Sequence, residues 1–340
     1  MPTTIKKIAQ LSGVSITTVS KILNGKDHDL SQATIARVKA IIEQENYYPS
    51  ILAQSMRNSQ MKLIALMIPD VRNPFFTDVI RGCEDCANKY GYSLVFCNSD
   101  NILEKEVNYI RSLQSRHIDG IVLSGLQIES KIKNHQLKLN VPYCFVTGNK
   151  KNYINESKLS LNNEGSYVAT QHLIDLGHKE ILFATGPSVY NHSNHGLLGY
   201  QEALKEKGLT FHTKNRFFLS GFSAEAGYEE LLPVLKETKA SAIVCGNDLI
   251  AYGVLKALRE LNKSVPEDFS VIGYDDIDTN QYLTPGLTSV NPNRYALGWD
   301  ATIELIEKIE NRNIDDYTEN SFVKLIIRET CGEPKHANKN

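Results

Sequence analysis

From residue 61 onward, short apolar segments alternate with segments whose apolar residues recur every three or four positions. The first kind predicts strands and the second kind predicts helices, closed by Gly91, Gly177 and Gly208. Strands that alternate with helices indicate a doubly wound, largely parallel α/β sheet, and there are enough strands for two sheets facing a cleft. The expected strands span 63–68, 94–97, 118–123, 142–147, 181–184, 242–245 and 270–274, and a helix capped by Asn73, with Pro74 in its first turn, follows the first of them.

Residues 1–48 show three short helical patterns instead. The hydroxyl of Thr4 can cap the first helix, and Gly13 ends it. Ser15 can cap the second helix, and a third helix begins at Ser31. Three short helices with a glycine-containing turn between the first two are typical of an all-α helix-turn-helix domain.

The second of these helices has a polar side that the expected core does not use. Its hydroxyls, amide and cation can bond base edges or phosphates, and its isoleucine can touch a thymine methyl group. Residues 1–60 carry a net charge of about +3 in a chain whose total is -2, an asymmetry typical of a DNA-binding domain joined to another domain. The alternative is a three-helix bundle that binds protein. The residues of this side are Ser15, Ile16, Thr17, Thr18, Ser20, Lys21 and Asn24.

A further short helix is expected in the linker that follows the three helices. Pro49 prevents the third helix from continuing, and Ser50 can cap a helix of about two turns. So short a helix is marginal alone in water, so we expect it to form only when two copies pack on DNA. The alternative is a disordered linker.

The head and linker resemble the lactose/galactose repressor family of transcription regulators. By this resemblance Ile16, Thr17 and Lys21 occupy the family's main base-reading positions. Thr4 and the linker residue Ala53 lie in DNA-contacting segments, and Met56 is the apolar wedge that enters the minor groove, where leucine is usual. The similar segments are Thr4-Ile5-Lys6-Lys7-Ile8-Ala9, Gly13-Val14-Ser15-Ile16-Thr17-Thr18-Val19-Ser20-Lys21-Ile22-Leu23-Asn24, Asn46-Tyr47-Tyr48-Pro49-Ser50 and Leu52-Ala53-Gln54-Ser55-Met56.

The body is similar to the effector domain of the same family, which shares its fold with periplasmic sugar-binding proteins. The resemblance implies a homodimer that reads a near-palindromic double-stranded DNA operator under the control of a small-molecule effector. It divides the chain into a head (1–48), a hinge (49–60), an N-subdomain (61–162 plus 291–321), a C-subdomain (163–290 plus 322–331) and a polar tail (332–340). The similar segments include Asn73-Pro74-Phe75-Phe76, Gly246-Asn247-Asp248, Val265-Pro266-Glu267-Asp268 and Gly273-Tyr274-Asp275-Asp276.

Several aromatic and polar residues fall at or after the ends of expected strands, where parallel sheets bind ligands. Aromatic faces with carboxylates and amides suit a polyhydroxylated ring, so we expect a sugar or a sugar derivative as effector. A sugar acid, a purine-like ring and a protein corepressor remain alternatives. Asn247 can equally be only a helix cap, and the two phenylalanines only core. The candidates are Asp70, Phe75, Phe76, Ser124, Thr147, His192, Phe222, Asn247 and Asp275.

Two positions depart from the family's pattern. Gly196 stands where an arginine often binds the sugar, and His192, Asn194 or His195 can replace that arginine. Arg294 stands where an aromatic residue is sometimes found. Its guanidinium can bind a carboxylate or phosphate of the ligand, or form a surface salt bridge.

Other functions lack their motifs. No phosphate-binding loop, dinucleotide fingerprint, zinc-protease pair or nucleophile elbow is present, so we expect neither an enzyme nor a cofactor. Cys83 and Cys86 fall in a helical pattern and are interpreted as buried small side chains rather than as a metal or redox pair. No membrane span or signal peptide is visible, so a cytoplasmic location is expected rather than that of an exported solute-binding receptor.

Overall fold

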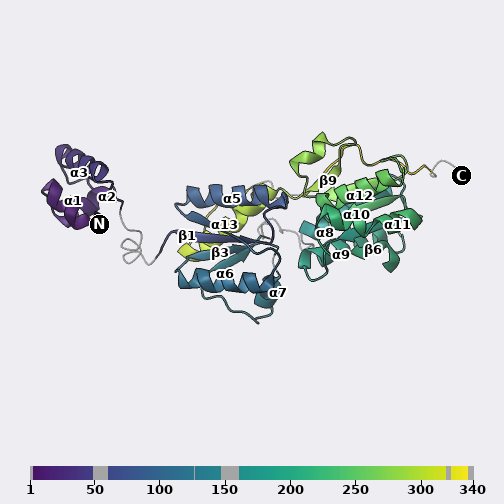
Figure 1. Ribbon diagram of the computed structural model, residues 1–340, viewed down its shortest axis with the longest axis horizontal. Coiled ribbons are helices and arrows are strands. Elements are labelled where there is room, and N and C mark those ends of the chain that lie inside the picture. The colour runs from purple at the N-terminus through teal and green to yellow at the C-terminus, as the bar shows by residue number, and fades with distance from the viewer. Residues whose placement is uncertain (1–2, 49–59, 126, 147–160, 319–322, 336–340) are drawn as a thin grey trace. The chain divides into compact units, whose positions relative to one another are not determined.

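The computed structural model describes residues 3–48, 60–125, 127–146, 161–318 and 323–335. The chain forms two compact units, residues 1–61 and residues 62–340 (Figure 1). Among the described helices, none is both long and apolar enough to cross a membrane.

The first unit contains three helices around a small core. They are α1 (Ile5–Ser12), α2 (Ile16–Leu23) and α3 (Gln32–Gln44). Thr4 and Ser15 cap the first two as predicted, and Ser31, the predicted first residue of the third helix, is its cap. Gly13 ends α1 with φ of 65°, a left-handed conformation that glycine adopts at little cost. The core consists of Ile8, Ala9, Val19, Ile22, Ile35 and Val38.

The second unit contains two sheets, and the first has the strand order β2-β1-β3-β4, all parallel. These strands are β1 (Leu63–Ile68), β2 (Ser93–Asn98), β3 (Gly120–Leu123) and β4 (Tyr143–Phe145). Side chains of β1 alternate between two cores: Ile64, Leu66 and Ile68 face one, and Ala65 and Met67 face the other.

Helices cover both faces of this first sheet (Figure 1). α5 (Phe75–Lys89) and α13 (Arg294–Glu310) pack on one face, and α6 (Leu103–Ser115) and α7 (Ile128–Lys133) pack on the other. α13 lies far from the others in sequence, so the chain returns to the first sheet after it has built most of the second.

The second sheet has the order β10-β9-β8-β7-β5-β6 and is parallel except for β10, which runs antiparallel to β9. Its described helices are α8 (Leu161–Asp175) and α9 (Asn191–Glu206) on one face, and α10 (Ala224–Glu229), α11 (Leu232–Glu237) and α12 (Asp248–Glu260) on the other. The strands are β5 (Ile181–Thr185), β6 (Arg216–Phe218), β7 (Ala242–Cys245), β8 (Ser270–Tyr274), β9 (Thr288–Asn291) and β10 (Lys324–Ile326).

These two sheets confirm the predicted doubly wound fold, with local corrections. Strands β6, β9 and β10 were not predicted. β3 begins at Gly120 rather than at residue 118, and β4 is shorter than the predicted 142–147 segment. The helix after β1 begins at Phe75, with Pro74 in the capping position, and the Asn73 carboxamide instead accepts the N–H of Phe75 at 3.0 Å.

Close contact between α5 and α13 requires glycine on both helices. A Cβ atom on Gly82 would overlap the carbonyl oxygen of Tyr295, and one on Gly298 would overlap that of Val79. Cys83 of α5 is completely buried, and burial raises the pKa of its thiol to about 12. This thiol stays protonated, which agrees with the predicted packing role.

Candidate DNA-binding face and ligand site

Helix α2 leaves one side uncovered. Val19 and Ile22 are buried in the core of the first unit, whereas Ser15, Ile16 and Thr17 are exposed at its beginning. Ile16 is 43% exposed, so its side chain is available to a partner outside the core. The remaining candidates on this helix are half-buried Thr18, Ser20 and Lys21 and exposed Asn24.

The polar groups of this side already have partners within the unit. The Ser15 hydroxyl accepts the N–H of Thr18 at 3.1 Å. The Lys21 ammonium contacts the Asp29 carboxylate at 2.5 Å and lowers the pKa of that carboxyl group. Both side chains are well exposed, so the pair is weak and Lys21 can exchange Asp29 for a phosphate or a base at small cost.

Two further candidates of the head and hinge are placed differently. Thr4 is exposed, and its hydroxyl accepts the N–H of Lys7 at 3.4 Å. Ala53 and Met56 lie outside the residues that the structure describes, as does Thr147 among the ligand candidates.

Four ligand candidates follow the carboxyl ends of strands. Asp70 follows β1, Ser124 follows β3, Asn247 follows β7, and Asp275 follows β8. The carboxylate of Asp70 is held by Arg72 through two nitrogens, at 3.0 and 2.8 Å, and this arginine lowers the pKa of Asp70. Asp70 therefore has a competing partner at this edge of the first sheet.

The two phenylalanines at the start of α5 differ in burial. Phe76 is 5% exposed and belongs to the core between β1, α5 and α13. Phe75 is half-buried and meets Phe76 edge to face, with ring centroids 5.0 Å apart. Only Phe75 retains ring surface that a ligand can contact.

Asn247 uses its side chain twice within the protein. Its amide oxygen caps α12 by accepting the N–H of Ile250 at 2.9 Å, and its amide nitrogen donates to the carbonyl oxygen of Phe222 at 3.2 Å. The amide retains one hydrogen and one lone pair for another partner. Asn247 therefore fixes the position of the Phe222 backbone beside its own polar group.

Asp275 is a buried carboxyl group in an uncommon backbone conformation. Its φ is 106°, and the residue is 7% exposed. Burial and the nearby carboxylate of Asp248 raise the pKa of Asp275 well above its usual value. Strained backbone that persists in a folded protein clusters at functional sites, and a protonated carboxyl group can donate as well as accept hydrogen bonds.

Asp248 stabilises the region behind Asp275. It is fully buried, and its carboxylate accepts bonds from the Ser289 hydroxyl at 2.6 Å, the Asn280 amide at 2.8 Å and the Ile277 N–H at 2.9 Å. Burial raises the pKa of Asp248 to about 6 despite these donors. Asp248 was not among the predicted ligand residues, although it follows the candidate Asn247 directly.

Three aromatic rings form a cluster after β5 and β6. The rings of His192 and Phe222 lie 4.8 Å apart at 33°, and Tyr190 contacts both, at 5.5 and 5.7 Å. Phe222 lies flat against the chain at Gly186, where a Cβ atom would overlap the ring. Burial, with a smaller effect of His195, lowers the pKa of His192 to about 4, so its imidazole is neutral at pH 7.

Gly196 occupies a position without space for a longer side chain. It is buried on α9, and a Cβ atom there would lie 3.1 Å from the Ser166 hydroxyl and 3.3 Å from the Phe183 ring. Of the three proposed replacements for an arginine, His192 joins the aromatic cluster and His195 is half-buried. Asn194 is exposed and donates to the Ser188 carbonyl oxygen at 2.7 Å.

Arg294 forms a salt bridge in which the guanidinium is buried rather than on the surface. It is 7% exposed, and its guanidinium contacts the Asp78 carboxylate on α5 at 2.7 Å. The same group donates to the carbonyl oxygens of Pro74 at 3.2 Å and Asp276 at 3.3 Å. Arg294 thus connects the start of α5, beside the first sheet, to the segment after β8 of the second.

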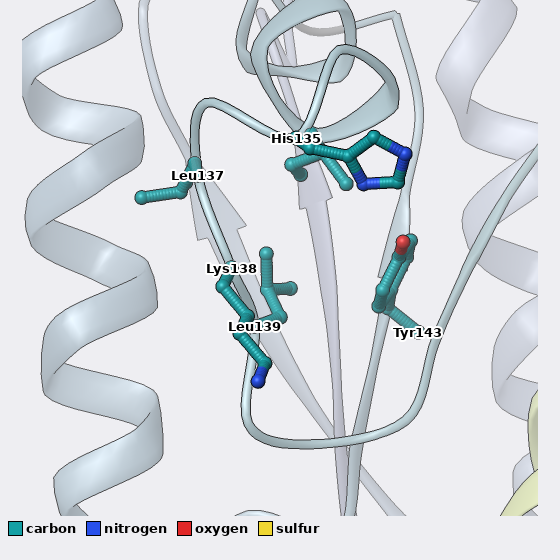
Figure 2. A pocket seen from close by; sticks show the side chains of 6 residues that line it. His135, Leu137, Lys138, Leu139 and Tyr143 are labelled. Carbon is teal, nitrogen blue, oxygen red and sulfur yellow. The ribbon is translucent and has the colours of Figure 1, made fainter.

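A separate pocket of about 330 Å³ lies before the start of β4 (Figure 2). His135 and Tyr143 lie on one side of it, and Leu137 and Lys138 lie on the other. It opens at the amino end of β4, so it contains none of the candidates at the carboxyl ends of strands. Among the described residues no group of histidine, cysteine or carboxylate side chains is arranged to hold a metal ion.

Comparisons with known proteins find family matches for both units of the chain. Residues 4–50 match the model of bacterial regulatory proteins of the lacI family, and residues 170–331 match a periplasmic binding protein-like domain. The ribose operon repressor of Halalkalibacterium halodurans is 33% identical over 96% of this chain and 97% of its own. The transcriptional repressor PurR of Photobacterium profundum is 31% identical over 96% and 98%.

Among solved structures, a Lac repressor dimer bound to operator and the anti-inducer ONPF has the same fold. Its TM-score is 0.82 at 24% identity, and the match covers 98% of this chain and all of the other. The similarity therefore extends over both the three-helix unit and the two sheets.

Proposed function

This chain belongs to the lacI family of bacterial regulatory proteins, as a DNA-binding transcriptional repressor with an effector-binding domain, and we propose that a sugar or sugar derivative is its effector. The proposed site lies at the carboxyl ends of the strands, where the Phe222 ring, Asn247 and Asp275 come from neighbouring loops of the second sheet. The observation that carries the proposal is the bond between the Asn247 amide and the Phe222 carbonyl, because it holds an aromatic ring beside a polar group.

This combination suits a pyranose or furanose ring. The CH groups of a sugar pack on an aromatic ring, while carboxyl and amide groups bond its hydroxyls. Asp275 with its raised pKa can donate to a ring or hydroxyl oxygen, and the free amide positions of Asn247 can both donate and accept. A relative 33% identical to this chain is named as a ribose operon repressor, which favours a pentose. The other proposed contacts are Asp70, Phe75, Ser124, Thr147 and His192, and Phe76 is proposed to support the Phe75 ring from the core.

A planar purine-like ring is the second candidate. The rings of His192 and Phe222 lie 33° apart, and the histidine is neutral at pH 7, so this pair offers uncharged aromatic surface on which a base can stack. Another relative is named as the repressor PurR.

The DNA-binding part is proposed to act as a homodimer on a near-palindromic operator. The exposed Ile16 and Thr17, together with Lys21, are proposed to read bases in the major groove. Met56 of the hinge is proposed to wedge into the minor groove. Further proposed DNA contacts are Thr4, Ser15, Thr18, Ser20, Asn24 and Ala53. The proposed division of the chain is a head of residues 1–48, a hinge of 49–60, and two subdomains of 61–162 plus 291–321 and 163–290 plus 322–331.

Isothermal titration of the full chain tests the effector. D-Ribose, other pentoses and hexoses, their phosphates, hypoxanthine and guanine are titrated against the native protein and a Phe222→Leu variant. A matched Phe218→Leu variant changes a half-buried phenylalanine of β6 outside the proposed site. We expect one sugar to bind the native protein and Phe218→Leu but to bind Phe222→Leu weakly. Binding of a purine alone selects the second candidate, and no binding by any sugar refutes the first.

A further inference from the structure

Tyr190 makes a hydrogen-bonded contact between the two sheets. It lies after β5 of the second sheet, and its hydroxyl donates to the Asn101 side-chain oxygen at 2.8 Å. The same hydroxyl lies 3.4 Å from the Gln127 amide nitrogen, which donates to it. Asn101 follows β2 and Gln127 follows β3, so both partners belong to the first sheet. Tyr190 is 7% exposed, so water competes little for this hydroxyl.

The receiving side of this contact is built into the first sheet. Asn101 has φ of 59°, a conformation that asparagine adopts more readily than most residues, and its carbonyl oxygen accepts a bond from the Gln127 amide at 2.7 Å. The backbone N–H groups of Gln127 and Ile128 in turn donate to the buried Glu106 carboxylate, at 3.3 and 2.8 Å. Asn101 and Gln127 are therefore held in place before Tyr190 reaches them.

The other end of Tyr190 packs against the proposed effector site. Its ring meets the edge of Phe222 at 5.7 Å and lies 5.5 Å from His192. A rigid phenol ring thus has its body among the aromatic residues of the second sheet and its hydroxyl on loops of the first. A shift of Phe222 moves this hydroxyl relative to Asn101.

We propose that Tyr190 is a positioning residue that couples occupancy of the effector site to the placement of the two sheets relative to each other. The coupling rests on the proposed function, because it requires that the effector contacts Phe222. A ligand packed on Phe222 changes the position available to the Tyr190 ring, and the bond to Asn101 passes that change to the first sheet. This coupling requires that the effector binds the bonded and unbonded arrangements with different affinities.

The size of the effect follows from the bond that is lost. A neutral hydrogen bond contributes a net stability that corresponds to about a 2- to 12-fold change in an equilibrium constant. Tyr190→Phe removes the hydroxyl and keeps the ring, so the population of the bonded arrangement changes by that factor. Operator affinity changes by up to the same factor, because one arrangement binds DNA better than the other.

Four full-chain variants test this coupling. Tyr190→Phe removes the donor, and Asn101→Gly removes the acceptor while tolerating the positive φ. The double variant completes a double-mutant cycle. Tyr228→Phe is the matched control, because its hydroxyl bonds Glu260 at 2.5 Å between two helices of the second sheet alone. Dissociation constants are measured on a duplex selected by the native protein from a random library, together with amide exchange of residues 100–102 and 127–128.

We expect each single variant to change the operator dissociation constant by about 2- to 12-fold and to speed exchange of both segments, with no further change in the double variant. Tyr228→Phe should match the native protein in both measurements. Native dissociation constants and exchange in Tyr190→Phe and Asn101→Gly would overturn the coupling while leaving the repressor function intact. Failure of the native protein to select any duplex would instead refute the proposed function.

Discussion

Replacing Asp275 with asparagine should stabilise this protein at neutral pH while weakening effector binding. Asp275 is buried beside the buried Asp248 carboxylate, and its pKa is raised by burial first and by Asp248 second. Asparagine has nearly the same shape, carries no charge and tolerates the positive φ of this position. The substitution removes the free-energy cost of protonating or charging this buried carboxyl group, without creating a cavity.

The magnitude can be worked from Asp248, whose pKa rises from 3.8 to about 6. A shift of about two pKa units corresponds to about 3 kcal/mol of stability lost at pH 7. Burial shifts the pKa of Asp275 in the same direction, so replacing this carboxyl group should stabilise the protein at pH 7. For a carboxyl group with a raised pKa the native state binds more protons, so stability is greatest below the unfolded pKa and falls as pH rises through the folded one.

Urea unfolding of the full chain at pH 5 and pH 7.5 measures this effect. The stabilisation by Asp275→Asn should be smaller at pH 5 than at pH 7.5. Asp276→Asn is a matched control, because the Asp276 carboxylate contacts the Arg328 guanidinium at 2.7 Å and its loss should destabilise the protein. A variant of Asp275 that is less stable than the native protein at pH 7.5, or equally affected at both pH values, contradicts this reasoning.

Three further changes test other parts of the chain. Ile16→Ala should weaken binding to the selected duplex by about 1–3 kcal/mol in gel-shift titrations. Thermal unfolding should stay unchanged, because the side chain is exposed. An equal loss of affinity for random DNA would argue against base reading by Ile16. Met56→Ala should also lower operator affinity, and an unchanged dissociation constant removes the wedge from the mechanism. Gly82→Ala should destabilise the second unit by about 1–3 kcal/mol in calorimetry, because the added methyl group forces α5 away from α13. Gly221→Ala is the control, because a methyl group there enters open space and should not destabilise the unit. Equal melting temperatures for the two variants would show that the helices adjust freely.

Local sequence signals predicted most of the fold. The caps at Thr4 and Ser15 depend on a hydroxyl and the next few backbone N–H groups, so neighbouring residues suffice to predict them. The buried strands β1, β7 and β8 have continuous apolar sequences, and their bounds agree with the prediction. Apolar periodicity and capping are properties of short segments, which the sequence displays directly.

The remaining features depend on contacts between distant residues. Strands β6 and β10 have three residues each, and β9 is rich in serine, threonine and asparagine, so their pairing partners define them rather than their own sequences. Position in sequence likewise showed that Asn247 and Asp275 follow strands, but it could not reveal that Arg294 meets Asp78 or that Tyr190 meets Asn101. Those contacts exist only once both sheets have formed.

The double use of the Asn247 side chain restricts how this repressor can acquire a new ligand. A residue without a side-chain oxygen removes the cap of α12, and one without a side-chain N–H group releases the loop that carries Phe222, so a change of chemistry at this position also costs structural stability. The His192 side chain neither caps a helix nor holds the Phe222 loop, so its replacement does not carry these two costs in stability. Divergence in ligand preference should therefore accumulate at positions like 192, while asparagine at 247 persists across proteins that respond to unlike molecules.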